Sequence, residues 1–294
     1  MGMKYNFAVL NSKVFTLKMK HHLIFRVFRI GIVILISLFA TISGNALANE
    51  IKIGGTGNAL GTMRLMGEAF SNKYPNMKVS VLASIGTSGA IKAVPKGVVD
   101  IGVASRPLTD EELATGVVAT EYSRSLTVLA VANKMKVVAI TSAQIADIYT
   151  GKLAKWPDGT PVRPVLRQPG DDNTRQIKSL LPEIEKALLA AEKRDGLAFA
   201  VIDQEAADKI ESIPGAFGTT TLALIKSEGR ALRALKLDGV EPTEKNGASG
   251  AYPLIKHFFF ITQKAPSSAV QQFIAFVNSP AGQGVLTKNG QWRP

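Results

Sequence analysis

The chain has 294 residues, no cysteine and a formal net charge of +12. The lack of cysteine excludes disulfides, thiolate nucleophiles and cysteine-based metal sites. Six of the 35 basic residues and none of the 23 acidic residues lie in residues 1–48. The remaining chain therefore carries only +6 and has no basic stripe interleaved with aromatics, which argues against nucleic acid as a partner.

Residues 1–48 have the order of a secretory signal peptide. A basic region precedes an apolar run, and Ala46-Leu47-Ala48 matches the small-residue pattern of a cleavage site. The strongly apolar core, Ile30 to Ala40, has about 11 residues, short of the roughly 20 that span a bilayer as a helix, so an uncleaved anchor is the less favoured alternative. We expect a cleaved, soluble protein in the periplasm of a double-membraned bacterium, since no cysteine could carry a lipid anchor.

After the leader, short β-type runs alternate with helical patterns. A strand over 50–57 ends in glycines and precedes a helix over 59–74, whose apolar residues recur at helical spacing. The next expected elements are strands at 78–86, 99–105 and 126–133 and a helix at 87–97. Strands that alternate with helices indicate an α/β fold with mostly parallel sheets.

The alternation continues beyond residue 134. The pattern predicts helices at 141–151 and 173–194, one or two closing helices within 267–290, and strands at 162–168, 196–202, 213–225 and 254–262. Pro182 is expected to end or kink the second of these helices, because proline lacks the N–H that a helix interior needs. The polar, turn-rich segment 236–253 is typical of a linker between two lobes or of a surface excursion.

Three strands run into turns rich in glycine, serine or threonine that open helices, at 54–62, 84–91 and 170–177. The first N–H groups of a helix have no intrahelical partner, and the helix dipole makes that end positive. Glycine lets the backbone approach a ligand, and short hydroxyl side chains add donors. For any one of these turns, ordinary helix capping is the favoured interpretation. Three in one chain suggest that they converge on one small anion.

Catalytic and cofactor chemistry find little support in the sequence. Gly55 and Gly57 begin a glycine-rich spacing, but Leu60 stands where a dinucleotide fingerprint has its third glycine. His257, the only histidine after the leader, lies in an apolar run, and no credible Ser-His-Asp set accompanies it. We therefore expect no enzyme activity, no metal site and no cofactor.

The succession of "GTGNALGTMRLMGEAF", "SIGTSGAIKAV", "DIGVASRPL", "IADIYTGK" and "DDNTR" resembles that of the periplasmic phosphate-binding proteins of ABC importers, roughly from Ile51 to Asn289. The resemblance implies a two-lobed fold, in which each lobe is a mostly parallel sheet flanked by helices and the ligand cleft lies between the lobes. Residues 49–132 plus 253–294 would form lobe 1, and residues 133–252 would form lobe 2. It also implies capture of phosphate or a close tetrahedral oxyanion and its delivery to an inner-membrane ABC permease. We expect a monomer.

Carried over by position, the resemblance implies a set of ligand-binding residues in the three turns, after the third strand and on the strand that ends near residue 167. These are Thr56, Gly57, Asn58, Thr87, Ser88, Gly89, Ser105, Arg167, Asn173 and Thr174. The candidate set also includes Arg106, which follows Ser105 as in some members of the family, and Asp171 and Asp172, which depart from the family pattern.

Two aspartates, Asp171 and Asp172, stand where the family usually has small donors. One of them could accept a proton from hydrogen phosphate and exclude sulfate, which has no proton to give, because an unpaired buried charge costs several kcal/mol. Both could instead be helix caps. We expect one aspartate to be the proton acceptor and the other to be the cap, with Asp172 the cap because it directly precedes the helical run that starts at Asn173.

The departure at these aspartates leaves the ligand open. Alternatives are a binder of another oxyanion or of an organic phosphate, and a periplasmic sensor that acts on a membrane partner.

Overall fold

The computed structural model describes residues 49–294. The predicted signal peptide and its cleavage site lie outside these residues. Within the part of the chain that is described, no helix is both long enough and apolar enough to cross a membrane.

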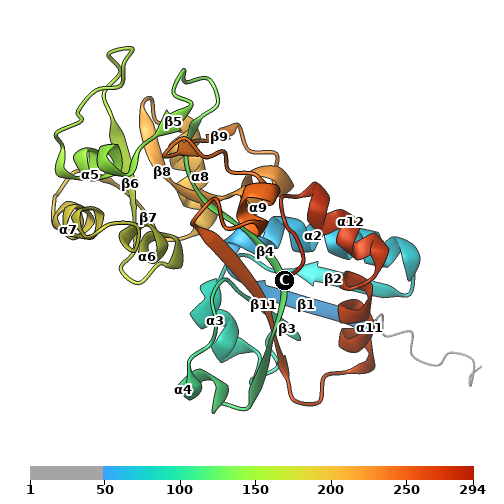
Figure 1. The fold of residues 1–294 in the computed structure, drawn as a ribbon. Helices are drawn as coiled ribbons and strands as arrows, with labels where there is room; N and C mark the ends of the chain where they lie inside the picture. Colours follow the sequence, from blue (N-terminus) through green and yellow to red (C-terminus); the bar gives the residue numbers. More distant parts are fainter. Residues whose placement is uncertain (1–48) are drawn as a thin grey trace, which may run out of the picture. The chain divides into compact units, whose positions relative to one another are not determined.

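A mixed sheet organises this part of the chain (Figure 1). Its strand order is β2-β1-β3-β11-β4-β8-β6-β7, with β9 paired to β4, and β5 and β10 form a separate pair. The strands are β1 (Asn49–Gly55), β2 (Met77–Val81), β3 (Ile101–Ala104), β4 (Val117–Ala132), β5 (Ala139–Ile140), β6 (Arg163–Arg167), β7 (Ala198–Ala200), β8 (Ala216–Thr221), β9 (Leu232–Ala234), β10 (Lys236–Leu237) and β11 (Ile255–Gln263).

The long strand β4 is shared by two groups of strands. Residues 117–126 pair with β11, residues 127–130 pair with β8, and residues 130–132 pair with β9. Parallel pairs join β1 to β2 and β3 in one group, and β6 to β7 and β8 in the other. The antiparallel pairs of the main sheet all involve β4 or β11. This arrangement confirms the expected two-lobed α/β fold, while the lobe boundaries proposed at residues 132 and 253 stay predictions.

Helices connect and cover these strands. They are α2 (Gly57–Lys73), α3 (Gly86–Ala93), α4 (Asp110–Leu113), α5 (Ser142–Thr150), α6 (Asp172–Lys178), α7 (Pro182–Ala191), α8 (Asp203–Ser212), α9 (Leu222–Ser227), α10 (Glu244–Ala248), α11 (Ser268–Val277) and α12 (Pro280–Lys288). The predicted break at Pro182 is confirmed, because this proline begins α7, where its missing N–H is harmless.

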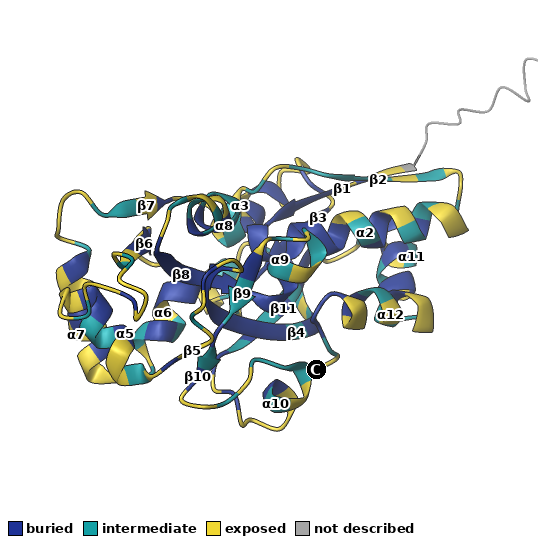
Figure 2. Ribbon diagram, turned by 90° about the horizontal axis from the view of Figure 1, so that it is seen from above, coloured by how far each residue is buried: buried dark blue, intermediate teal, exposed yellow. Residues whose placement is uncertain are grey.

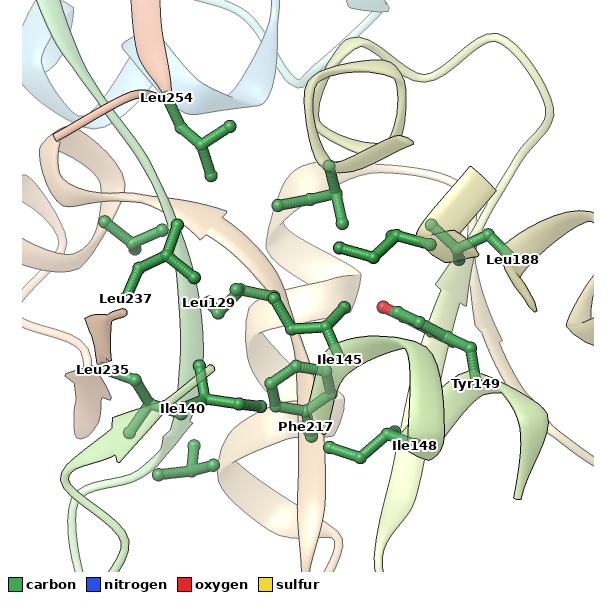
Figure 3. Close-up of a cluster of buried hydrophobic side chains, with 14 of the residues drawn as sticks. Leu129, Ile140, Ile145, Ile148, Tyr149, Leu188, Phe217, Leu235, Leu237 and Leu254 are labelled. Carbon is green, nitrogen blue, oxygen red and sulfur yellow. The ribbon is translucent and has the colours of Figure 1, made fainter. Parts of the chain in front are cut away.

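Each group of strands packs its own apolar core. Ile53, Phe70 and Phe273 belong to one core, and Leu129 and Phe217 belong to another, which Figure 3 shows. The strand β8 and the second half of β4 are buried, whereas α7 exposes one of its faces (Figure 2). Among the described residues, the buried apolar side chains form four clusters in all. Burial of each Leu, Ile or Phe side chain contributes about 1.5–3 kcal/mol, so these clusters hold the strand ends in place.

Five turns follow the carboxyl ends of parallel strands. The strands β1, β2, β6 and β7 lead into α2, α3, α6 and α8, and β3 ends at the turn that begins with Ser105. Ligands of α/β proteins bind at such strand ends, because the loops there are free to present side chains and helix N-termini. These turns are therefore the place to look for a site.

Candidate functional site

A cavity of about 670 Å³ lies where the five turns meet. Nine of the predicted ligand-binding residues line it: Thr56, Asn58, Thr87, Ser88, Ser105, Arg106, Arg167, Asp171 and Asp172. The other four, Gly57, Gly89, Asn173 and Thr174, are not among the residues that line it. Residues from turns that are more than 140 positions apart in the chain thus share one cavity.

The turn before α2 presents backbone and hydroxyl donors to an acidic side chain from another turn. Thr56 stands at the N-cap position but makes no side-chain cap. Instead its Oγ1 donates to Asp203 Oδ2 at 3.3 Å, and the Asn58 N–H donates to the same oxygen at 3.1 Å. Asp203, at the start of α8, was not among the predicted residues, because an aspartate at a helix start ordinarily serves its own helix.

The turn before α3 leaves its donors free for a ligand. The first N–H groups of a helix have no intrahelical partner. No side chain within the described residues caps α3, so these groups are open to a ligand. Thr87 Oγ1 accepts the Ser105 N–H at 3.1 Å, and the two hydroxyl oxygens are 3.4 Å apart. Together with Ser88, these residues form the part of the lining with neutral hydrogen-bond donors.

Arg167, the last residue of β6, lies between two buried carboxylates. Its side chain is 4% exposed, its Nη2 donates to Asp171 Oδ1 at 2.8 Å, and its Nη1 lies 2.9 Å from Asp203 Oδ1. The second contact is an ion pair at hydrogen-bond distance, so among the described residues Nε is the guanidinium nitrogen that lacks a partner. A buried donor without a partner destabilises a protein by about 1–3 kcal/mol, a cost that a hydrogen bond from Nε to a ligand oxygen would remove.

Asp171, not Asp172, caps α6, so the expected choice of cap was wrong, while the expectation that one of the two aspartates accepts a proton from the ligand stays a prediction. Asp171 Oδ2 accepts the Thr174 N–H at 2.9 Å and the Thr174 hydroxyl at 3.1 Å. The reason is that Asp172 already has helical geometry as the first residue of α6. Burial raises the pKa of Asp171, and the nearby charge of Asp203 adds to this, although Arg167 opposes it.

Asp172 is held by cations of its own. It pairs with the fully buried Lys256 of β11 and with Arg175, whose Nη2 lies 3.0 Å from Asp172 Oδ1. Burial alone would raise the pKa of Asp172, but the charges and hydrogen bonds of Lys256 and Arg175 hold it below its ordinary value. Lys256 could have been noticed in the sequence, because it alternates with Phe258 and Phe260 on the buried face of a strand.

Arg106 is also neutralised within the chain. It forms two hydrogen bonds of 2.7 Å with Glu112 of α4. The hydrogen bonds from Arg106 hold the pKa of Glu112 well below its usual range, at about 2. The cations beside the cavity are therefore balanced by carboxylates, so a bound anion would depend on hydrogen-bond donors more than on net positive charge.

Groups for covalent or metal chemistry are not assembled here. His257 does not line the cavity; its Nδ1 lies 2.7 Å from Glu121 on the surface of β11 and β4. In residues 49–294 no three His, Asp or Glu side chains are grouped to hold a metal ion. What the cavity offers is hydroxyl, N–H and guanidinium donors beside acidic acceptors, which suits reversible binding of a small oxyanion.

Comparisons with known proteins agree with this geometry. The family model of the PBP superfamily domain matches residues 40–281. The phosphate-binding protein PstS of Borreliella burgdorferi is 25% identical over 248 residues, which cover 82% of this chain and 88% of that protein.

Solved structures give the same result. A protein from Clostridium perfringens, described as a phosphate ABC transporter substrate-binding protein with bound phosphate, superposes with a TM-score of 0.71 at 25% identity, covering 84% of this chain and 100% of that one. An ABC-type phosphate transport receptor from Vibrio cholerae has a TM-score of 0.58 at 19% identity over 83% of this chain and 100% of that one, a likeness of fold. The family match covers most of the chain, and the chain therefore belongs to the PBP superfamily.

Proposed function

We propose that this protein is an exported solute-binding protein that captures phosphate, or a close tetrahedral oxyanion, in this cavity and delivers it to an inner-membrane ABC permease. The observation that carries the proposal is the buried guanidinium of Arg167, whose Nε lacks a hydrogen-bond partner among the described residues, beside a cavity lined by hydroxyl and N–H donors. The names of the relatives in Borreliella burgdorferi and Clostridium perfringens support phosphate as the ligand.

The roles of the residues follow from their positions. The N–H groups that open α3, together with the hydroxyls of Thr87, Ser88 and Ser105, would bind the ligand oxygens from one side. Arg167 would bind from the other side, through Nε, the guanidinium nitrogen that neither aspartate occupies. Asp171 is the acidic group best placed to accept a proton from the ligand, because it lines the cavity and its pKa is raised by burial.

The transport cycle needs the two lobes to open and close. We propose that residues 49–132 with 253–294 and residues 133–252 move as two bodies about the crossings of the chain, closing on the ligand and opening to release it. The protein would act as a monomer in the periplasm after removal of residues 1–48, without enzyme activity, cofactor or nucleic acid.

Isothermal titration calorimetry tests the ligand directly. The purified protein is titrated with sodium phosphate, sulfate, molybdate and a phosphonate at neutral pH. We expect phosphate to bind most tightly, with Ser88→Ala and Thr87→Val weakening its binding by about tenfold each, the size of one lost hydrogen bond to a charged group. Failure of phosphate to bind at millimolar concentration would refute the assignment.

A further inference from the structure

The carboxylate of Asp203 occupies donors that the sequence assigns to the ligand. It extends from the start of α8 to the start of α2, and its side chain is 8% exposed. One oxygen accepts from Thr56 Oγ1 and from the Asn58 N–H, and the other lies against Arg167. Two neutral donors on one oxygen and a guanidinium on the other are the contacts that one edge of a bound oxyanion would receive.

The fit between these two helix starts is specific. A Cβ added to Gly57 would lie 2.9 Å from the Asp203 Cβ and 2.3 Å from Gln204 Oε1, so only glycine allows this approach. The next residue, Gln204, donates from Nε2 to the Gly57 carbonyl oxygen at 2.9 Å and to Glu228 Oε1 at 2.8 Å. The contact of α8 with α2 is therefore held by the packing as well as by the charge of Asp203.

A ligand oxygen cannot share these donors with a carboxylate. Each N–H and O–H donates to one strong acceptor at a time, and two negative groups in contact in a poorly solvated site repel each other by several kcal/mol. An oxyanion at the start of α2 therefore has to displace Asp203, or bind beside it with fewer donors. Both routes lower the affinity compared with a site that lacks this carboxylate.

We propose that Asp203 is an internal anion that competes with the ligand for the α2 donors and for Arg167, and so sets the affinity of the site. This inference rests on the proposed oxyanion function and adds to it an affinity-determining residue. Asp203 keeps the donors ordered and paired when the cavity is empty, and its return to them favours release of the ligand to a partner.

Two variants of Asp203 and one matched control test the competition. Asp203→Asn removes the charge and keeps the shape, whereas Asp203→Ser also withdraws the side chain from α2 and serves as the second test if the first variant does not fold. Glu205→Gln removes a charge from the same first turn of α8, where Glu205 pairs with Lys209 at 2.6 Å and lies outside the cavity lining. Phosphate and sulfate affinities are measured by calorimetry, and folding is checked by thermal melting.

We expect both Asp203 variants to bind phosphate at least about tenfold more tightly than the wild type, with sulfate affinity rising in parallel. The control should stay within about twofold, because its charge is screened by solvent. Weaker phosphate binding by the Asp203 variants, or unchanged affinity, would overturn the inference and leave the proposed function standing. If neither the wild type nor any variant binds an oxyanion, the proposed function falls, and the inference with it.

Discussion

Replacement of Arg167 by alanine should destabilise the protein as well as impair binding. The change leaves two buried carboxylates, Asp171 and Asp203, without the guanidinium that lies within 2.9 Å of both. Removal of one partner from a buried ion pair costs about 3–5 kcal/mol, because an uncompensated charge stays behind. This is a large share of the roughly 5–15 kcal/mol that stabilises an ordinary domain.

The loss should depend on pH with a definite sign. The pKa of Asp171 is already raised above its ordinary value of 3.8, and loss of Arg167 would raise it further. A carboxyl group whose pKa is higher in the folded protein than in the unfolded chain stabilises the folded state when it is protonated. This stabilisation is complete below the pKa of the unfolded chain and is lost as the pH rises through the pKa of the folded protein. The stability difference between wild type and Arg167→Ala should therefore shrink as the pH falls below neutrality.

Urea denaturation followed by tryptophan fluorescence measures these differences. Arg163→Ala is the matched control, because Arg163 lies on the same strand but is exposed, and we expect it to change stability by less than about 1 kcal/mol. The double variant Arg167→Ala with Asp203→Asn should recover at least about 1 kcal/mol of the loss, since it removes one of the two orphaned charges. A loss below about 1 kcal/mol for Arg167→Ala at neutral pH would show that the two aspartates do not carry buried charges as described.

Three further changes probe the surroundings of the site. Gly57→Ala should displace Gln204, which the new Cβ would approach to 2.3 Å, and should lower stability by about 1–3 kcal/mol in urea melts; an unchanged midpoint would contradict the close packing. Lys256→Met should lower the free energy of unfolding by about 1–3 kcal/mol, because part of the Asp172 charge is left unpaired. A melting temperature equal to that of the wild type would argue against the buried pair. Glu112→Gln should make the protein less stable than the wild type by about 1 kcal/mol at pH values above 4.5, the pKa of Glu112 in the unfolded chain. Because the pKa of Glu112 in the folded protein is about 2, this difference should disappear as the pH falls toward 2. A difference in melting temperature that does not change with pH would exclude the effect.

Most predictions that depended on local pattern agree with the structure, but the strand expected over 213–225 ends at Thr221, where Thr221 caps helix α9. The alternation of strands and helices and the break at Pro182 each involve residues within a few positions of one another. Helical and strand periodicity, proline geometry and capping are set by such short-range contacts, so they can be inferred from one sequence. The resemblance to phosphate-binding proteins of ABC importers added the overall two-lobed arrangement.

The assignment of the two neighbouring aspartates shows the limit of local pattern. Asp171 and Asp172 both precede a helical run, and either could cap it. The choice depends on where the backbone turns from extended to helical, a boundary that pattern places only within a few residues. In the structure that turn falls after Asp171, and Asp172 is directed instead toward Lys256 and Arg175.

The sequence by itself determined that this protein is an α/β protein with glycine- and hydroxyl-rich turns at its strand ends, because such features arise between near neighbours in the chain. Only the tertiary structure decided which charges meet at the cavity. Asp203 reaches Asn58 across 145 positions, and Lys256 reaches Asp172 across 84. The pairing itself carries no local signature. Asp203 is acceptable as an ordinary helix-start residue, and the position of Lys256 on the buried face of a strand indicates that it needs a partner without identifying that partner. The pairs form when the cores pack and bring distant strand ends together.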